Sequence, residues 1–153
     1  MKIFIKLLVI IIVITAAAAG YFFYQKNLPP APVEYRNNEY GFNFSLPETW
    51  KGYSVIIAKW EGGYASGPII SIRHPLWTSE NPRQDIPIMV LTLEQWMDLQ
   101  QDKFHIGAAP IGPSELSRNS RYVFALPARY NYAFPAGFEE VDQIIQYKPL
   151  KTF

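Results

Sequence analysis

Two histidines and one carboxylate are the residues of this chain with the clearest potential for chemistry. His74 and His105 are the only histidines, and Asp85 follows the first of them. Two imidazoles and a carboxylate form a ligand set that suits divalent transition metals. Neither histidine has a second ligand at the His-x-His or i, i+4 spacing, so a metal site needs the fold to bring the three residues together. The alternative is that each histidine packs within its loop and donates a hydrogen bond to a backbone carbonyl.

Nucleophilic groups are present without the sequence surroundings that usually activate them. Ser66, Ser71 and Ser79 lie outside any Gly-x-Ser-x-Gly pattern. The glycine-rich residues 62–68 have neither a P-loop lysine nor a helical pattern behind them. The chain has no cysteine, which excludes disulfides, zinc–thiolate sites and a thiol nucleophile. We therefore expect no catalytic residue and no cofactor; the alternative is a hydrolase or metal-binding enzyme that uses the two histidines and Asp85.

Three loop-like stretches, residues 75–87, 105–113 and 127–135, have the composition of an interaction surface. They combine tryptophan, tyrosine and arginine with several prolines. Those three residue types are enriched at binding hot spots, and proline lowers the entropy lost when a loop is ordered by a partner. The candidate binding-surface residues are Trp77, Arg83, Gln84, Asp85, Arg129 and Tyr132. The alternative is that the aromatic residues cover the core while the charged residues keep the surface soluble.

The charge distribution argues against a nucleic-acid partner. Residues 33–153 contain 11 Lys/Arg and 13 Asp/Glu, a formal net charge of −2. These charges are scattered along the chain and form no basic stripe. Because neutralising phosphates requires such a stripe, we expect no nucleic acid among the partners.

The amino-terminal segment has the composition of a membrane span. Lys2 and Lys6 precede an uncharged run over residues 7–24, LLVIIIVITAAAAGYFFY. Its 18 residues rise about 27 Å as a helix, and the flexible side chain of Lys6 lets the segment reach the roughly 30 Å hydrocarbon thickness. The aromatic residues at its end match an interfacial belt, and the preceding positive charges favour a cytoplasmic amino terminus.

These features predict a cytoplasmic stub and signal anchor over residues 1–24, which contacts the lipid bilayer through residues 3–24. The domain that follows would then lie outside the cytoplasm, held at the cell membrane by a single pass. The alternative is a signal peptide that is cleaved near Ala19, since small residues occur there, which would release a secreted or periplasmic protein.

The rest of the chain divides into a proline-rich linker, residues 25–32, and one globular domain, residues 33–153. Alternating or continuous apolar runs predict strands at residues 41–46, 53–60, 69–73, 86–91, 122–128 and 130–134. Thr92 and Gln95 have the spacing of a capping box, with Leu93, Trp96, Met97 and Phe104 on the apolar stripe of the helix it starts. Residues 137–146 predict a second helix, whose first turn contains Glu139 and Glu140. The fold class is therefore α+β, a mostly antiparallel sheet of about six strands flanked by helices.

The beginning of the domain resembles a known family. Residues 38–50, NEYGFNFSLPETW, match the Tyr-Gly-Phe-x-Phe-x-Leu-Pro strand and following tryptophan that are typical of the start of PsbP-like domains. That family also ends with a helix packed on the sheet, as residues 137–146 would be, whereas residues 57–133 carry no family motif. The resemblance implies an αβα sandwich that serves as a binding or accessory module, and it carries no active site.

Together, these patterns predict a membrane-anchored extracytoplasmic binding or accessory domain. Its expected partner is a protein at the cell envelope.

Overall fold

The computed structural model describes residues 14–15, 17–24, 32–108 and 111–153. The chain forms two compact units, residues 1–31 and residues 32–153. In the first unit, residues 14–15 and 17–24 are helical, and Phe22 and Phe23 are exposed. Within the described residues, no helix combines the length and the apolar character needed to cross a membrane. Residues 1–13 and 16 of the predicted anchor, which covers residues 1–24, and residues 25–31 of the predicted linker, which covers residues 25–32, lie outside the described residues.

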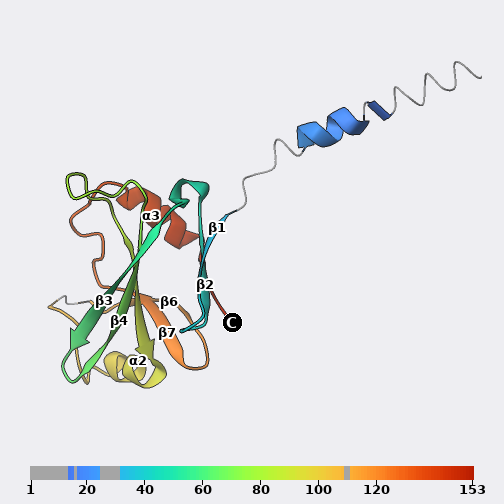
Figure 1. The fold of residues 1–153 in the computed structure, drawn as a ribbon. Coiled ribbons are helices and arrows are strands. Elements are labelled where there is room, and N and C mark those ends of the chain that lie inside the picture. The colour runs from blue at the N-terminus through green and yellow to red at the C-terminus, as the bar shows by residue number, and fades with distance from the viewer. Residues whose placement is uncertain (1–13, 16, 25–31, 109–110) are drawn as a thin grey trace, which may run out of the picture. The chain divides into compact units, whose positions relative to one another are not determined.

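The second unit is an α+β domain with two antiparallel sheets (Figure 1). The small sheet has the order β1 (Val33–Asn37), β2 (Phe42–Leu46), β8 (Leu150–Thr152). The large sheet has the order β3 (Ser54–Gly62), β4 (Ala65–Arg73), β5 (Ile86–Thr92), β7 (Tyr122–Leu126), β6 (Ser114–Arg118). The helices are the 3-10 helix η1 (Glu48–Trp50) and the α-helices α2 (Leu93–Gln100) and α3 (Phe138–Gln146). The antiparallel α+β class is confirmed, but the prediction of one sheet with about six strands is wrong.

The discrepancy has a local cause. The strands that were not predicted, β1, β6 and β8, are only five, five and three residues long. β6 and β8 are largely polar, and the alternation in β1 is limited to Val33 and Tyr35. The predicted strand at residues 130–134 is a succession of turns instead. Phe134 has a φ angle of 47° and Arg129, directly before the segment, one of 54°, both outside the β region.

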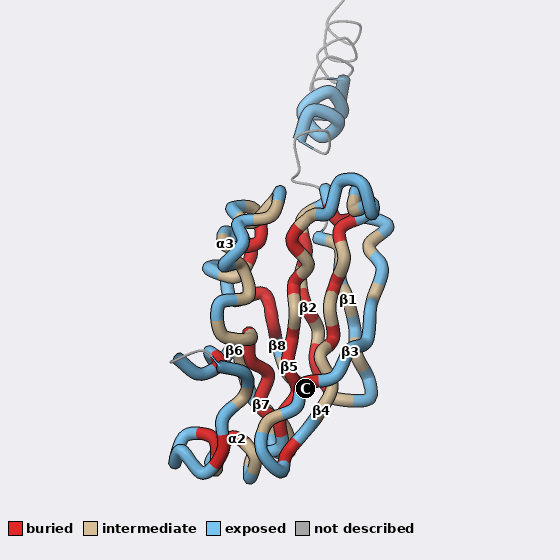
Figure 2. Tube along the Cα trace, turned by 90° about the vertical axis from the view of Figure 1, so that its left-hand side faces the viewer, coloured by how far each residue is buried: buried red, intermediate tan, exposed pale blue. Residues whose placement is uncertain are grey.

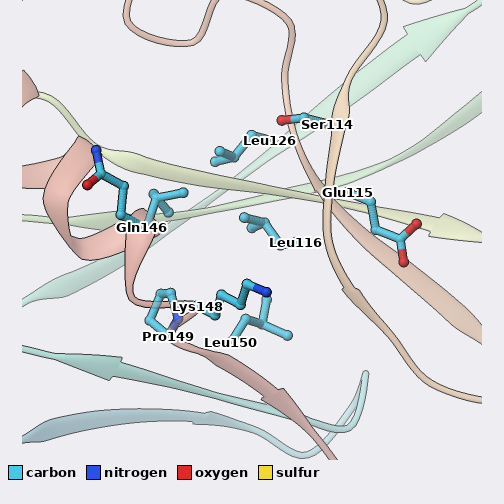
Figure 3. Close-up of a pocket in the computed structure, with 9 residues that line it drawn as sticks. Ser114, Glu115, Leu116, Leu126, Gln146, Lys148, Pro149 and Leu150 are labelled. Carbon is cyan, nitrogen blue, oxygen red and sulfur yellow. The ribbon is translucent and has the colours of Figure 1, made fainter.

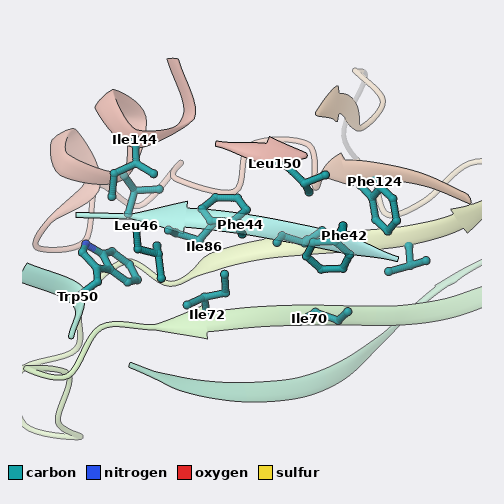
Figure 4. Close-up of a cluster of buried hydrophobic side chains, with 13 residues drawn as sticks. Phe42, Phe44, Leu46, Trp50, Ile70, Ile72, Ile86, Phe124, Ile144 and Leu150 are labelled. Atoms are coloured by element: carbon teal, nitrogen blue, oxygen red, sulfur yellow. The ribbon is translucent and has the colours of Figure 1, made fainter. Parts of the chain in front are cut away.

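The main core lies between the two sheets (Figure 4). The inward side of β2 contributes Phe42, Phe44 and Leu46, and Trp50 of η1 extends the same layer. They pack against isoleucines of β4 and β5 and against Val141 and Ile144 of α3, and most of these side chains are fully buried (Figure 2). Removing one buried phenylalanine ring typically costs about 3–5 kcal/mol. This layer therefore contributes strongly to holding the small sheet and α3 against the large sheet.

A second core lies on the opposite face of the large sheet, under α2. Thr92 and Gln95 form the predicted capping box, with both reciprocal hydrogen bonds present. Leu99 is buried here, whereas Met97, which the sequence places on the apolar stripe, is 58% exposed. The helix ends at Gln100, so Phe104 reaches this core from the loop that follows.

The two sheets approach each other at diagonally opposite corners. At one corner, the Tyr53 hydroxyl before β3 donates to the Glu34 carbonyl of β1 over 3.3 Å. At the other, the Thr152 hydroxyl of β8 donates to the Arg118 carbonyl of β6 over 3.2 Å. Between these corners the edges diverge, and the carboxyl end of α3 lies where β6 and β8 are separated (Figure 2).

Candidate functional site

Two of the predicted loops meet beside the start of α3, although they are far apart in the sequence. The backbone N–H of Gln84 donates to the Ala136 carbonyl over 2.9 Å, and the Gln84 side chain donates to the Tyr130 carbonyl over 3.3 Å. Gly137, which has a φ of 83°, allows this approach, because a Cβ there would lie 2.9 Å from Arg83 Nη2. The third predicted loop, residues 105–113, belongs to the region after α2.

Arg83 and Gln84 support these loops from inside instead of forming an open surface. The Arg83 guanidinium pairs with Glu140 of α3 at 3.4 Å, with about a quarter of the arginine side chain exposed. The same carboxylate accepts hydrogen bonds from the Thr49 hydroxyl at 2.8 Å and from the Trp50 indole at 3.2 Å. Gln84 is 7% exposed. Glu140 therefore ties η1, the loop before β5 and α3 together.

Trp77 and Asp85 are joined through Arg73 at the end of β4. Arg73 donates from Nε and Nη2 to both carboxylate oxygens of Asp85, at distances between 2.8 and 3.2 Å. Its guanidinium also lies 3.8 Å from the ring centroid of Trp77, a cation–π contact. The carboxylate of Asp85 is thus already paired.

Of the predicted surface residues, Arg129 and Tyr132 are the exposed ones, and Tyr132 is 76% exposed. Their loop is held to α3 by the Tyr130 hydroxyl, which donates to the Asp142 carboxylate. Burial, followed by this hydrogen bond, raises the pKa of Tyr130 above its usual range. The loop therefore presents Tyr132 from a fixed base.

The three candidate metal ligands do not meet. His74 follows β4 at its Arg73 end, whereas His105 lies beside Gly62, at the tip of the β3–β4 hairpin. The nine residues of β4 separate these ends by about 26 Å, far beyond the span of one metal site. In residues 32–108 and 111–153, no three His, Asp or Glu side chains lie close enough to hold a metal ion.

His74 has a structural environment. Its ring is 3% exposed and lies edge-on to the ring of Trp50, with centroids 4.9 Å apart. Its Nδ1 accepts a hydrogen bond from the Leu76 backbone N–H at 3.0 Å. Burial, then the nearby Arg83 cation, lower the pKa of His74 below its ordinary value, against a smaller opposite effect of Glu140. The imidazole is therefore held in its neutral form, and it accepts a hydrogen bond from the backbone of its own loop.

A hollow that the sequence did not indicate runs beside the outer side of α3, and we call it the α3 groove. It has a volume of about 530 Å³. Its lining includes three prolines, two aliphatic side chains and one tyrosine, with two lysines at the edge: Pro32, Leu46, Pro47, Ile144, Tyr147, Pro149, Lys148 and Lys151. Ser45, Thr49, Glu140 and Gln143 complete it. Tyr147 is 86% exposed, so its ring stands at the edge of the groove.

A second hollow, the β6–β8 wedge, occupies the gap where these two edge strands diverge. It measures about 470 Å³. Leu116, Leu126 and Leu150 converge on it from β6, β7 and β8, while the carboxylate of Glu115 points away from them (Figure 3). Glu115 is paired with Arg118, which lowers the pKa of its carboxyl. The wedge is therefore mainly an apolar gap between two strand edges.

The turn between α3 and β8 separates the two hollows. The backbone N–H of Tyr147 donates to the Ile144 carbonyl, and that of Lys148 to the Ile145 carbonyl, so the helix ends tightly. Lys148 has a φ of 50°, and Pro149 cannot continue a helix. Lys148 and Pro149 line both hollows. The one sequence signal for this site is Tyr147, an aromatic residue placed directly after a helix and outside its apolar stripe.

Comparisons with protein-family profiles, with curated proteins and with solved structures found no match. Family, activity and partners are therefore inferred from the residues of this chain.

Proposed function

We propose that this chain is a membrane-anchored, extracytoplasmic binding module whose α3 groove contacts a protein of the cell envelope. The observation that carries the proposal is Tyr147, a residue that is 86% exposed and lines a groove together with proline and aliphatic side chains. Tyrosine is among the residues that contribute most to binding, and a position fixed by a helix end costs little entropy on association.

The membrane part of the proposal rests on the amino-terminal sequence. The uncharged run over residues 7–24 and the lysines before it favour a single pass with the domain outside. Cleavage near Ala19 is the competing outcome. Extraction of native membranes with alkaline carbonate, followed by the intact mass of the protein, distinguishes the two. An anchored chain stays in the pellet at full mass, whereas a cleaved chain is released and about 2 kDa lighter.

We also propose that the domain is a divergent PsbP-like module. Support comes from three features of the family pattern. The resembling segment forms β2, the tryptophan after it, Trp50, is 1% exposed in the core, and the last helix, α3, packs on the sheets. With α2 on the other face of the large sheet, helices cover both sides.

Photo-crosslinking in intact membranes tests the binding function. The full chain carries p-benzoylphenylalanine in place of Tyr147, and a control carries it in place of Tyr64. Tyr64 is 70% exposed at the tip of the β3–β4 hairpin, away from both hollows. We expect a discrete cross-linked protein from position 147 and none from position 64. Equal products from both positions, or none from either, would refute the assignment of the groove.

A further inference from the structure

The lysines of the domain divide into two classes. Three of them have carboxylate partners: Lys51 with Glu48, Lys59 with Glu61 and Lys103 with Asp98. The other two, Lys148 and Lys151, have no ion pair within the described residues, and both line the α3 groove. Both lysines without an ion pair therefore belong to the lining of the α3 groove, and Lys148, at the turn between the hollows, lines the β6–β8 wedge as well.

The carboxylates in and beside the groove do not neutralise Lys148 and Lys151. Glu140, the carboxylate that lines the groove, is engaged by Arg83, Thr49 and Trp50 on its inner side. Gln143 is uncharged. Glu34 is exposed on β1 opposite Ser45, so it lies on the neighbouring strand instead of in the lining. The local excess of charge in the groove is therefore positive.

The kind of anion follows from the shape and the cations. Lysine binds carboxylate and phosphate alike as a point charge, so the apolar side chains among the described lining residues select the occupant. Its volume of about 530 Å³ accommodates a few side chains, and its walls are rigid prolines and Tyr147. A carboxylate-bearing peptide with an apolar side chain at its centre complements both the lysines and the lining.

On the basis of the proposed function, we propose that the α3 groove binds an acidic protein segment: an aliphatic or aromatic residue packs against Tyr147, Ile144 and Pro149, and flanking Asp or Glu residues pair with Lys148 and Lys151. Such exposed pairs contribute modestly to affinity and strongly to selectivity, so both the apolar contact and the charges are required.

The test uses the full chain in phosphatidylcholine nanodiscs and a fluorescein-labelled peptide, Gly-Glu-Glu-Leu-Phe-Glu-Glu-Gly, with anisotropy as the readout. We expect saturable binding that weakens as salt rises. The double variant Lys148→Gln/Lys151→Gln should bind about tenfold more weakly, the loss expected for two partly shielded ion pairs. The control Lys51→Gln/Lys59→Gln removes the same charge from paired lysines and should leave affinity within about twofold. Unfolding midpoints of both variants show that the fold is retained.

Three results would overturn the proposal: no saturable binding, equal weakening in the two double variants, or unchanged binding when Leu-Phe in the peptide is replaced by Gly-Ser. The last outcome would show mere charge attraction. If the peptide fails while position 147 still cross-links a discrete protein in membranes, the binding function stands and only the acidic class of partner is wrong.

Discussion

Replacing Glu140 by glutamine should destabilise the domain far more than the same change at the adjacent Glu139. The substitution keeps the shape of the side chain and removes the charge that faces Arg83, at 3.4 Å. Glu139 lies in the same first turn of α3 but is exposed. The sequence alone does not distinguish the two carboxylates, because both lie in the first turn of a helix, where a negative charge is stabilising.

The size of the effect follows from burial. Side-chain exposures are 26% for Arg83 and 31% for Glu140, between a surface pair and a buried one. Exposed pairs contribute about 0–1 kcal/mol, whereas breaking a fully buried pair costs about 3–5 kcal/mol. Arg83 Nε is already buried without a hydrogen-bond partner, so the guanidinium has no ready substitute for the lost carboxylate. We therefore expect Glu140→Gln to lower the free energy of unfolding by about 2 kcal/mol.

Urea unfolding of the full chain in detergent micelles, followed by tryptophan fluorescence, measures this difference. The signal includes Trp50, which donates to Glu140, and the four tryptophans together follow unfolding of the whole domain. The control Glu139→Gln loses only an interaction with the helix dipole, about 0.5 kcal/mol. A loss at Glu140 below about 0.5 kcal/mol, or equal losses at both positions, would refute the role of this carboxylate in joining η1, the loop and α3.

Two further predictions concern buried positions. Burial lowers the pKa of His74 in the folded chain, so below the ordinary histidine pKa of about 6.5 the unfolded chain binds more protons than the folded one. The contribution of His74 to stability is therefore full above about pH 6.5. It falls as the pH drops through that value, by at most about 1.4 kcal/mol per pH unit. His74→Gln should remove this slope in urea titrations at several pH values, and the exposed control His105→Gln should keep it. Gly67→Ala places a Cβ 2.7 Å from the Trp60 indole nitrogen, so it should lower the free energy of unfolding, measured by thermal unfolding, by about 1–3 kcal/mol. At the control position Gly112, an added Cβ meets nothing within 4 Å. Gly112→Ala should therefore lower the free energy of unfolding by less than about 0.5 kcal/mol.

Local signals in the sequence predicted the longer elements well. The capping box at Thr92 starts α2, and the apolar runs correspond to β2, β3, β4, β5 and β7 within a few residues. Pro68 shows why one boundary was wrong. The expected strand began after it, but β4 starts at Ala65 and already pairs with β3 through Pro68, whereas the ladder with β5 begins only at Ile69.

The candidate site was beyond prediction because it depends on long-range pairing. The polar loop residues look like a surface in sequence, yet Gln84 bonds to Ala136, about fifty residues further on, and Glu140 draws Arg83 inward. The α3 groove exists only because β8 returns beside β2, a pairing set by the three residues Leu150–Thr152. No local pattern specifies either arrangement.

The position of β1 has a mechanical consequence. This first strand of the domain is five residues long, pairs on one side only with β2 and has Val33 and Tyr35 as its half-buried residues. Any tension along an amino-terminal tether therefore reaches β1 first. A force at Val33 directed away from β2 would open the β1–β2 ladder from its Leu46 end, one pair at a time, instead of loading all its hydrogen bonds together. A tether of the kind proposed above would thus pull on a strand that yields progressively under load, while β2, fixed by its phenylalanines, keeps the core closed.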